Sequence, residues 1–197
     1  MNATDHPDDG DRLDETDRDS QINEFLEKLG MAGQRPDQTP YMPKELWSEI
    51  KPGLWVGGTG SSDEIFSRRP IDAEPEITKK QFDTVITMYA WARPADWFVK
   101  EIRFGIYDAD MSDFEVRALQ DLVKIAHSDW REGQKVLVRC QAGINRSSLV
   151  AALVLFRDGM KAEEAIALLR EKRAGGVLRN SYFEEWLLAI DPKDWRH

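Results

Sequence analysis

The chain has 197 residues, 41% of them hydrophobic, which is enough for one substantial core, and its formal net charge is −9 at pH 7. The first twenty residues hold eight carboxylates and two arginines, a balance of −6 that leaves −3 for the other 177 residues. A pI near 4.9 argues against general nucleic-acid binding. No segment has the length and apolarity of a membrane span, and the acidic first residues are typical of neither a secretory signal nor a transit peptide, so we expect a cytoplasmic protein.

The first part of the chain divides by composition into a tail and a short helix. Residues 1–19 are polar and acidic and lack aromatic side chains, which is typical of a disordered segment. Apolar residues then recur at helical spacing up to Gly30, so residues 20–43 are predicted to be an amphipathic helix and a linker. We expect this helix to pack on the globular domain, predicted at residues 44–197; the alternative is a helix that binds a partner.

The globular part begins with strand patterns. β-Branched and aromatic residues cluster between Gly, Pro and charged residues in four segments, residues 53–58, 82–89, 101–108 and 134–140. The clearest helical pattern separates the last two segments, where Ser112 and Glu115 form a candidate capping box and one apolar face runs to Trp130. A helix between successive strands implies a parallel crossover, so we predict an α/β fold with a mostly parallel central sheet flanked by helices.

The chain after residue 145 is helical in pattern to its end. Glycines separate three predicted helices, at residues 146–159, 161–173 and 181–190. The last of these is predicted to be capped by Asn180 or Ser181.

The segment from Cys140 to Ser147, CQAGINRS, joins the last predicted strand to a helix. In that geometry the loop N–H groups and the helix dipole attract an anion, and the same field favours the nucleophilic thiolate form of Cys140. Arg146 offers a bidentate fork for phosphate oxygens, Gly143 permits a tight turn, and Ser147 can hydrogen-bond the sulfur. The pattern predicts a phosphate-binding loop with a nucleophile; the alternative for the chain's one cysteine is an inert buried thiol.

The run VLVRCQAGINRSSLVAAL resembles the signature of the cysteine-based protein phosphatases, closest to the dual-specificity branch, whose pattern is His-Cys, five residues, then Arg-Ser or Arg-Thr. The segments WSEIKPGLWVGG, FDTVITM and LREKRAGGVLRNSYFEEWL are also similar to that family, so the likeness covers about residues 44–190. The resemblance implies a phosphocysteine intermediate on Cys140, with Arg146 and Ser147 assisting and with no metal or other cofactor. The substrate phosphate would then be bound by the loop residues Gln141, Ala142, Gly143, Ile144, Asn145 and Arg146.

One position departs from the family pattern, because Arg139 stands where the family usually has the histidine that orients the loop. If Arg139 points into the core it needs an acidic partner, since a lone buried charge is costly. We expect reduced or shifted activity. An absence of turnover over the whole pH range would favour a pseudophosphatase that recognises a phosphorylated partner.

Phosphate ester hydrolysis through a thiol also needs a carboxyl group as general acid and then as base. The resemblance places it about thirty residues before the nucleophile, where FGIYDADMSD contains three aspartates. Asp108 is preferred because it lies 32 residues before Cys140, at the end of the predicted strand. Asp110 is the alternative, and Asp113 is more simply a first-turn helix acid. All three can also be ordinary loop and cap acids.

Together these residues predict an enzyme, a dual-specificity-type protein phosphatase. The loop interior has no lysine, unlike family members that act on phosphoinositides, which favours phosphotyrosine and phosphoserine or phosphothreonine in proteins as substrates. A catalytically weak phosphate-binding module is the main alternative, and a rhodanese-type sulfur transferase fits the Arg-Ser helix start less well. The three histidines are dispersed and suggest no metal cluster. Trp91 and Trp97 can border the substrate cleft, although packing at the edge of the core is the preferred expectation.

Overall fold

The computed structural model describes residues 40–70, 72–111 and 115–196, which belong to one compact unit, Thr39–His197. The predictions for the acidic tail and the helix at residues 20–30 lie outside the described residues, as do those for Ser112 and Asp113. None of the helices in the described part of the chain is long and apolar enough to cross a membrane.

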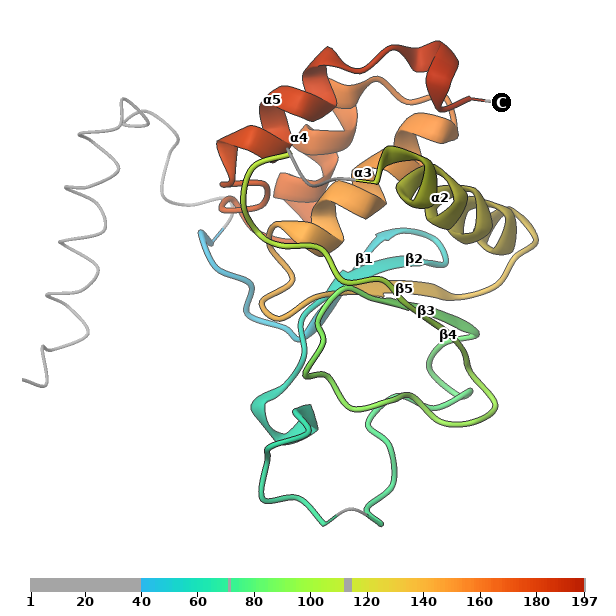
Figure 1. The fold of residues 1–197 in the computed structure, drawn as a ribbon, viewed down its shortest axis with the longest axis vertical. Helices are drawn as coiled ribbons and strands as arrows, with labels where there is room; N and C mark the ends of the chain where they lie inside the picture. Colours follow the sequence, from blue (N-terminus) through green and yellow to red (C-terminus); the bar gives the residue numbers. More distant parts are fainter. Residues whose placement is uncertain (1–39, 71, 112–114, 197) are drawn as a thin grey trace, which may run out of the picture. The chain divides into compact units, whose positions relative to one another are not determined.

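Five strands form one sheet in the order β1-β2-β5-β3-β4 (Figure 1). Strands β2, β5, β3 and β4 are parallel, and β1 pairs antiparallel with β2 across a turn at Gly53. Each of the four predicted strand segments overlaps a strand, whereas β1 lies outside them. The strands are β1 Trp47–Lys51, β2 Leu54–Gly57, β3 Thr84–Thr87, β4 Lys100–Arg103 and β5 Val136–Arg139.

Strand β4 is shorter than the predicted segment 101–108, because it ends at Arg103. The expectation that Asp108 lies at the end of this strand is therefore wrong. Phe104 still donates its backbone N–H to the Thr87 carbonyl, but the chain then leaves the sheet edge. Residues 104–111 form no strand, so Asp108 lies in an irregular loop.

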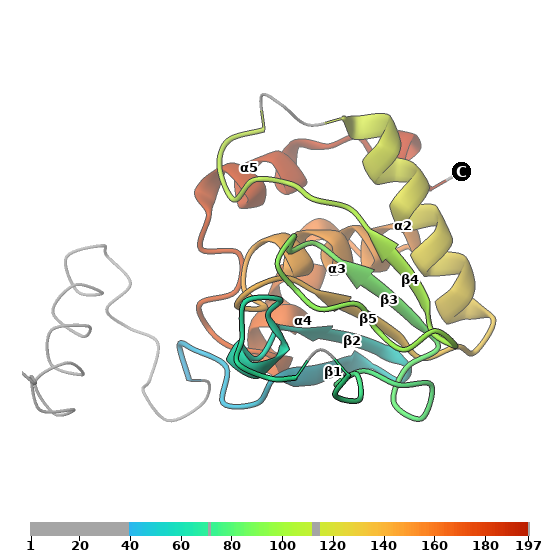
Figure 2. The ribbon, with the colours of Figure 1, turned by 60° about the horizontal axis from the view of Figure 1, so that its bottom comes forward.

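The helices α2 Val116–Arg131, α3 Arg146–Arg157, α4 Ala162–Lys172 and α5 Ser181–Ala189 all lie on one side of the sheet (Figures 1 and 2). The Asn180 side chain accepts the N–H of Tyr182 at 3.1 Å, so Asn180 is the cap of α5. The predicted mostly parallel sheet flanked by helices is thereby confirmed.

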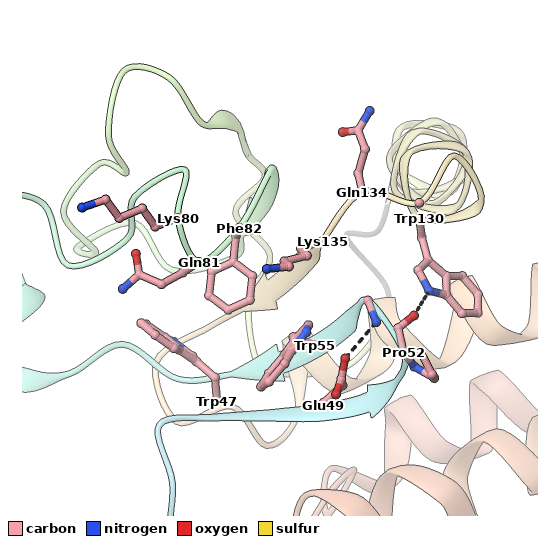
Figure 3. A pocket seen from close by; sticks show the side chains of 12 residues that line it. Trp47, Glu49, Pro52, Trp55, Lys80, Gln81, Phe82, Trp130, Gln134 and Lys135 are labelled. Atoms are coloured by element: carbon pink, nitrogen blue, oxygen red, sulfur yellow. Dashed lines mark hydrogen bonds between the residues drawn. The ribbon is translucent and has the colours of Figure 1, made fainter.

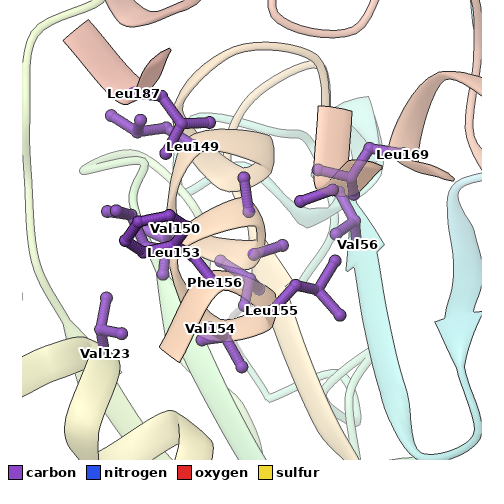
Figure 4. Close-up of a cluster of buried hydrophobic side chains, with 14 of the residues drawn as sticks. Val56, Val123, Leu149, Val150, Leu153, Val154, Leu155, Phe156, Leu169 and Leu187 are labelled. Carbon is purple, nitrogen blue, oxygen red and sulfur yellow. The ribbon is translucent and has the colours of Figure 1, made fainter. Parts of the chain in front are cut away.

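Helix α3 is the centre of the main core. Every residue from Ser147 to Phe156 is buried, because α3 packs against the sheet and against each of the other three helices (Figure 4). Burial of one large aliphatic side chain contributes about 1.5–3 kcal/mol, so this packing fixes the first turn of α3 firmly. The start of α3 is also the end of the CQAGINRS loop.

The alternation of side chains along β5 separates two environments. Val136 and Val138 face the helices, whereas Leu137 faces a smaller cluster on the other side of the sheet. Residues 58–70, 72–83 and 89–99 cover that second side (Figure 1). By the same alternation Arg139 points toward these covering segments, while Cys140 belongs to the core on the helical side.

Candidate active site

The CQAGINRS loop lies at the carboxyl ends of the parallel strands, between β5 and the first turn of α3. The loop is compact because Gly143 has φ +72°, a conformation that L side chains rarely adopt. A Cβ atom on Gly143 would lie 2.5 Å from the Gly57 carbonyl carbon and 2.5 Å from Nη2 of Arg173. Glycine is therefore required here both for the turn and for the close approach of β2.

Cys140 is the first residue of this loop and is 3% exposed. Its Sγ accepts the N–H of Gly143 at 3.2 Å and lies 3.2 Å from Oγ of Ser147. The N-cap residue Asn145 makes no side-chain cap to α3, so the first N–H groups of the helix are left for another acceptor. The thiol thus lies where loop amides and a helix N-terminus favour negative charge.

Arg146, the first residue of α3, is held by a backbone carbonyl and an aromatic ring. Its Nη1 donates to the Met88 carbonyl at 3.2 Å, and its guanidinium lies 5.8 Å from the centre of the Tyr89 ring. Its Nε is buried and has no hydrogen-bond acceptor among the described residues. Because an unpaired buried donor costs about 1–3 kcal/mol, an oxygen of a bound anion would stabilise this arrangement.

Asp108 lies beside the loop although it is far from the loop in sequence. Nδ2 of Asn145 donates to both carboxylate oxygens, at 3.1 and 2.9 Å, and Nδ2 of Asn180 donates to Oδ1 at 2.9 Å. Two amides from two different helix N-termini therefore fix the carboxylate next to the loop, where its exposed position leaves it accessible to a substrate. The sequence predicted Asn180 only as a helix cap and did not predict its hydrogen bond to Asp108.

Arg139 is fully buried, with 1% of its surface exposed, and it has the acidic partner that burial requires. Its Nη1 lies 2.9 Å from Oδ2 of Asp63, and its Nη2 lies 3.2 Å from Oε1 of Glu101. Thr87 Oγ1 accepts its Nε at 3.0 Å, and the Arg93 carbonyl accepts Nη2 at 2.6 Å. The expectation that a buried Arg139 has an acidic partner is confirmed, and Arg139 has two such partners, Asp63 and Glu101.

The two acids respond differently to this environment. Burial raises the pKa of Asp63, against the opposing effect of the Arg139 and Arg69 guanidiniums. Burial also acts to raise the pKa of Glu101, but hydrogen bonds from Thr87 and the Ala95 amide, together with nearby arginines, bring it below its ordinary value. Glu101 is therefore the acid that holds its charge more firmly beside Arg139.

Arg173, at the end of α4, supports the loop from behind and was not among the predicted site residues. Its guanidinium is buried and donates to the Gly143 carbonyl at 3.2 Å, the Ala142 carbonyl at 3.4 Å and the Glu45 carbonyl at 2.7 Å. Burial lowers the pKa of Arg173 to about 10, opposed by attraction to the negative forms of Cys140 and Glu45. Since 10 is far above 7, Arg173 keeps its positive charge at neutral pH and adds to the field that favours a thiolate.

A groove of about 530 Å³ lies away from the CQAGINRS loop and is lined by residues of β1 and β2 and of the segments that precede β3 and β5 (Figure 3). Trp47, Trp55 and Phe82 supply apolar lining, and the groove contains none of the predicted site residues. It lacks a thiol, so the loop chemistry does not occur there. Within residues 40–70, 72–111 and 115–196 no cluster of three or more His, Cys, Asp or Glu side chains is placed to hold a metal ion.

The fold is that of an α/β protein with a strand-loop-helix segment around its cysteine, and comparison with known proteins specifies the family. The family described as "Dual specificity phosphatase, catalytic domain" matches residues 68–193, more than half of the chain. The chain therefore belongs to the dual-specificity phosphatase family, as the resemblance implied.

Individual relatives agree with this assignment. A putative tyrosine phosphatase, 123R, of invertebrate iridescent virus 6 is 29% identical over 54% of this chain and 78% of its own length. Human protein tyrosine phosphatase type IVA 3 is 35% identical over a shorter stretch, 31% of this chain and 36% of the human protein.

Solved structures share the fold. The human tyrosine phosphatase-like serine/threonine/tyrosine-interacting protein superposes with a TM-score of 0.55 at 23% identity, over 72% of this chain and 92% of that one. The structure of Tk-PTP in the active form gives a TM-score of 0.55 at 20% identity, over 78% of this chain and 97% of that one.

Proposed function

We propose that this protein is a phosphatase that hydrolyses phosphotyrosine, and phosphoserine or phosphothreonine, in proteins through a phosphocysteine intermediate on Cys140. The observation that supports this most is the buried, unpaired Nε of Arg146 in the same loop as Cys140. The lysine-free loop interior favours phosphoproteins over phosphoinositides. Hydrolysis of para-nitrophenyl phosphate that vanadate inhibits is the first test, and its absence at every pH would contradict the proposal.

In the first step the Cys140 thiolate attacks phosphorus, so an S–P bond forms while the ester O–P bond breaks. The Arg146 guanidinium and the loop amides of residues 141–146 stabilise charge on the phosphoryl oxygens. Asp108 donates its proton to the departing alcohol or phenol oxygen. Asn145 and Asn180 hold Asp108 beside the loop for this transfer.

In the second step a water molecule attacks the phosphocysteine and gives its proton to the Asp108 carboxylate. A new O–P bond forms, the S–P bond breaks, and inorganic phosphate leaves. The departing Cys140 thiolate is stabilised by the Gly143 N–H and, in this proposal, by a hydrogen bond from Ser147. Arg173 contributes its charge from behind the loop.

Asp108→Asn is expected to lower kcat by about 10²-fold on phenyl phosphates with poor leaving groups, because an amide cannot protonate the leaving oxygen. The loss should shrink on para-nitrophenyl phosphate, whose leaving group needs little protonation. Asp110→Asn is the matched control and should retain most of the rate. A larger loss in Asp110→Asn on the poor leaving group would reassign the general acid to Asp110.

Ser147→Ala is expected to slow the second step, roughly tenfold, because the departing sulfur loses a hydrogen bond. Rapid-quench kinetics should then show a burst of para-nitrophenol and accumulation of phosphocysteine. Ser148→Ala is the control, because Ser148 is equally buried in the same helix turn and its Oγ has no partner among the described residues. Equal kinetics in the two variants would exclude the proposed role of Ser147.

A catalytically weak protein that binds a phosphorylated partner is the second candidate. Two observations favour it: Arg139 replaces the histidine of the family pattern, and one structural relative is named as an interacting protein. The two candidates differ in one measurement. Tight phosphopeptide binding without turnover in the wild type would favour the binding module, whereas turnover that depends on Cys140 favours the enzyme.

A further inference from the structure

The two loops that follow β2 and β3 carry exposed apolar side chains, Ile65, Phe66 and Trp91, which we name the apolar platform. We propose that this platform binds a large apolar side chain that flanks the phosphorylated residue of an extended peptide substrate. The inference rests on the proposed phosphatase function and adds a sequence preference to it.

The platform is a continuous apolar surface formed by both loops. Phe66 is 73% exposed and Trp91 47% exposed, and their ring centres lie 5.0 Å apart with the planes inclined by 49°. The N–H of Ile65 donates to the Trp91 carbonyl at 2.8 Å, which joins the loops directly. The expectation that Trp91 packs at the edge of the core is thus only partly met. Exposed, paired aromatic side chains are typical of surfaces that bind a partner.

Two arginines hold the platform in one conformation. Arg93 donates to four acceptors of the first loop, at distances from 2.6 to 3.2 Å: the carbonyls of Glu64, Arg69 and Pro70 and Oγ of Ser67. Arg103, at the end of β4, donates to the carbonyls of Tyr89, Ala90 and Ala92. Because the loops are already ordered, binding to them costs little conformational entropy.

The platform adjoins the phosphate-binding loop through Tyr89. The guanidinium of Arg146 lies 5.8 Å from the centre of the Tyr89 ring, and the Tyr89 hydroxyl donates to Oε1 of Glu64 at 3.1 Å. Glu64 directly precedes Ile65 and Phe66 in the chain. A peptide whose phosphate is bound by Arg146 therefore reaches the platform across one tyrosine ring, whereas a small phosphate monoester does not.

A peptide suits this surface better than a membrane. The carboxylate of Glu64 borders the platform, and residues 21–197 carry a formal net charge of −3, so this part of the chain has no excess of positive charge to attract an anionic bilayer. Two other exposed aromatic residues, Trp97 and Phe98, lie next to the amino end of β4, whereas the platform's loops leave the carboxyl ends of β2 and β3. Trp97 is 98% exposed, so the expectation that it packs at the core edge is wrong.

The test uses phosphotyrosine peptides in which one leucine is moved along an alanine background on either side of the phosphotyrosine. The quantity measured is the ratio of kcat/KM for each leucine peptide to that for the all-alanine peptide. Wild type is expected to show a ratio of roughly ten at one leucine position, because the leucine side chain becomes buried on the platform. The increase should come from a lower KM, with kcat unchanged. In Phe66→Ala/Trp91→Ala the ratio should fall to about one at that position.

The matched control is Trp97→Ala/Phe98→Ala, which removes the same two residue types and should keep the wild-type ratio. A wild-type ratio near one, or a ratio retained in the platform variant, would overturn the proposal. If the wild type turns over no peptide, the phosphatase proposal fails, but the platform proposal can still be tested by binding. The Kd of each leucine peptide is then compared with that of the all-alanine peptide, in the wild type and in the platform variant, and the same outcomes support or overturn the proposal. Cosedimentation with phosphatidylcholine and phosphatidylserine vesicles that is lost only in the platform variant would overturn it in favour of a membrane surface.

Discussion

Cys140→Ser is expected to abolish turnover of para-nitrophenyl phosphate, with a loss in kcat on the order of 10⁴-fold or more, because the serine hydroxyl is not ionised where a thiolate is. The loop should keep its shape, since the substitution exchanges one atom and the Gly143 N–H still meets an acceptor. The variant should therefore still bind a phosphopeptide. Turnover that persists in Cys140→Ser would rule out the phosphocysteine mechanism.

The chain's single cysteine makes an independent measurement possible. Iodoacetate should add one carboxymethyl group to the wild type, with loss of activity, and vanadate should protect against it. Mass spectrometry of Cys140→Ser should show no addition. Labelling of the wild type that vanadate leaves unchanged would mean that the anion does not bind at Cys140.

Arg139→Met is expected to lower the free energy of unfolding by about 3 kcal/mol, because it removes the cation shared by buried Asp63 and half-buried Glu101 and leaves each acid only its second arginine, Arg69 or Arg103. Two further hydrogen bonds, to Thr87 and to the Arg93 carbonyl, are lost with it. Urea denaturation followed by tryptophan fluorescence measures the change. Activity per folded molecule should also fall, because Arg139 directly precedes the nucleophile.

The control for this prediction is Lys79→Met, which breaks an exposed ion pair with Asp83 and should cost only about 0–1 kcal/mol. Arg139→His, which places the residue of the family pattern here, should also destabilise, since imidazole cannot reach two acids and two neutral acceptors together. A loss of less than 1 kcal/mol in Arg139→Met would show that the buried network contributes nothing net to the fold.

The candidate site was largely predictable because its centre is local in sequence. Cys140, Gly143, Arg146 and Ser147 lie within eight residues between a strand and a helix, so spacing alone predicts that they form one loop. The preference for Asp108 came from its distance to Cys140 along the chain. The structure places Asp108 beside the loop, as expected. However, Asp108 belongs to an irregular segment and not to the end of a strand, and it is held by hydrogen bonds from Asn145 and Asn180.

Contacts between segments distant in sequence were not predictable. Arg173 lies thirty residues beyond Gly143 in a helix rich in charged residues, where it appears as an ordinary last-turn cation. Because a lone buried charge is costly, the sequence predicts that a buried Arg139 has an acidic partner. It does not predict which of the 36 acidic residues is that partner. Only the register of β3, β4 and β5 selects Thr87 and Glu101, because it brings them to the same side of the sheet as Arg139.

The sequence by itself thus determined the fold class, the family and the position of the CQAGINRS loop between a strand and a helix, because periodicity and loop spacing are local properties of the chain. The tertiary structure alone decided which distant side chains complete the site: Asn180 at Asp108, Arg173 behind the loop and Asp63 at Arg139. It also decided that Phe66 and Trp91 form one exposed surface. These pairings depend on strand order and on helix packing, which bring segments together in space irrespective of their separation along the chain.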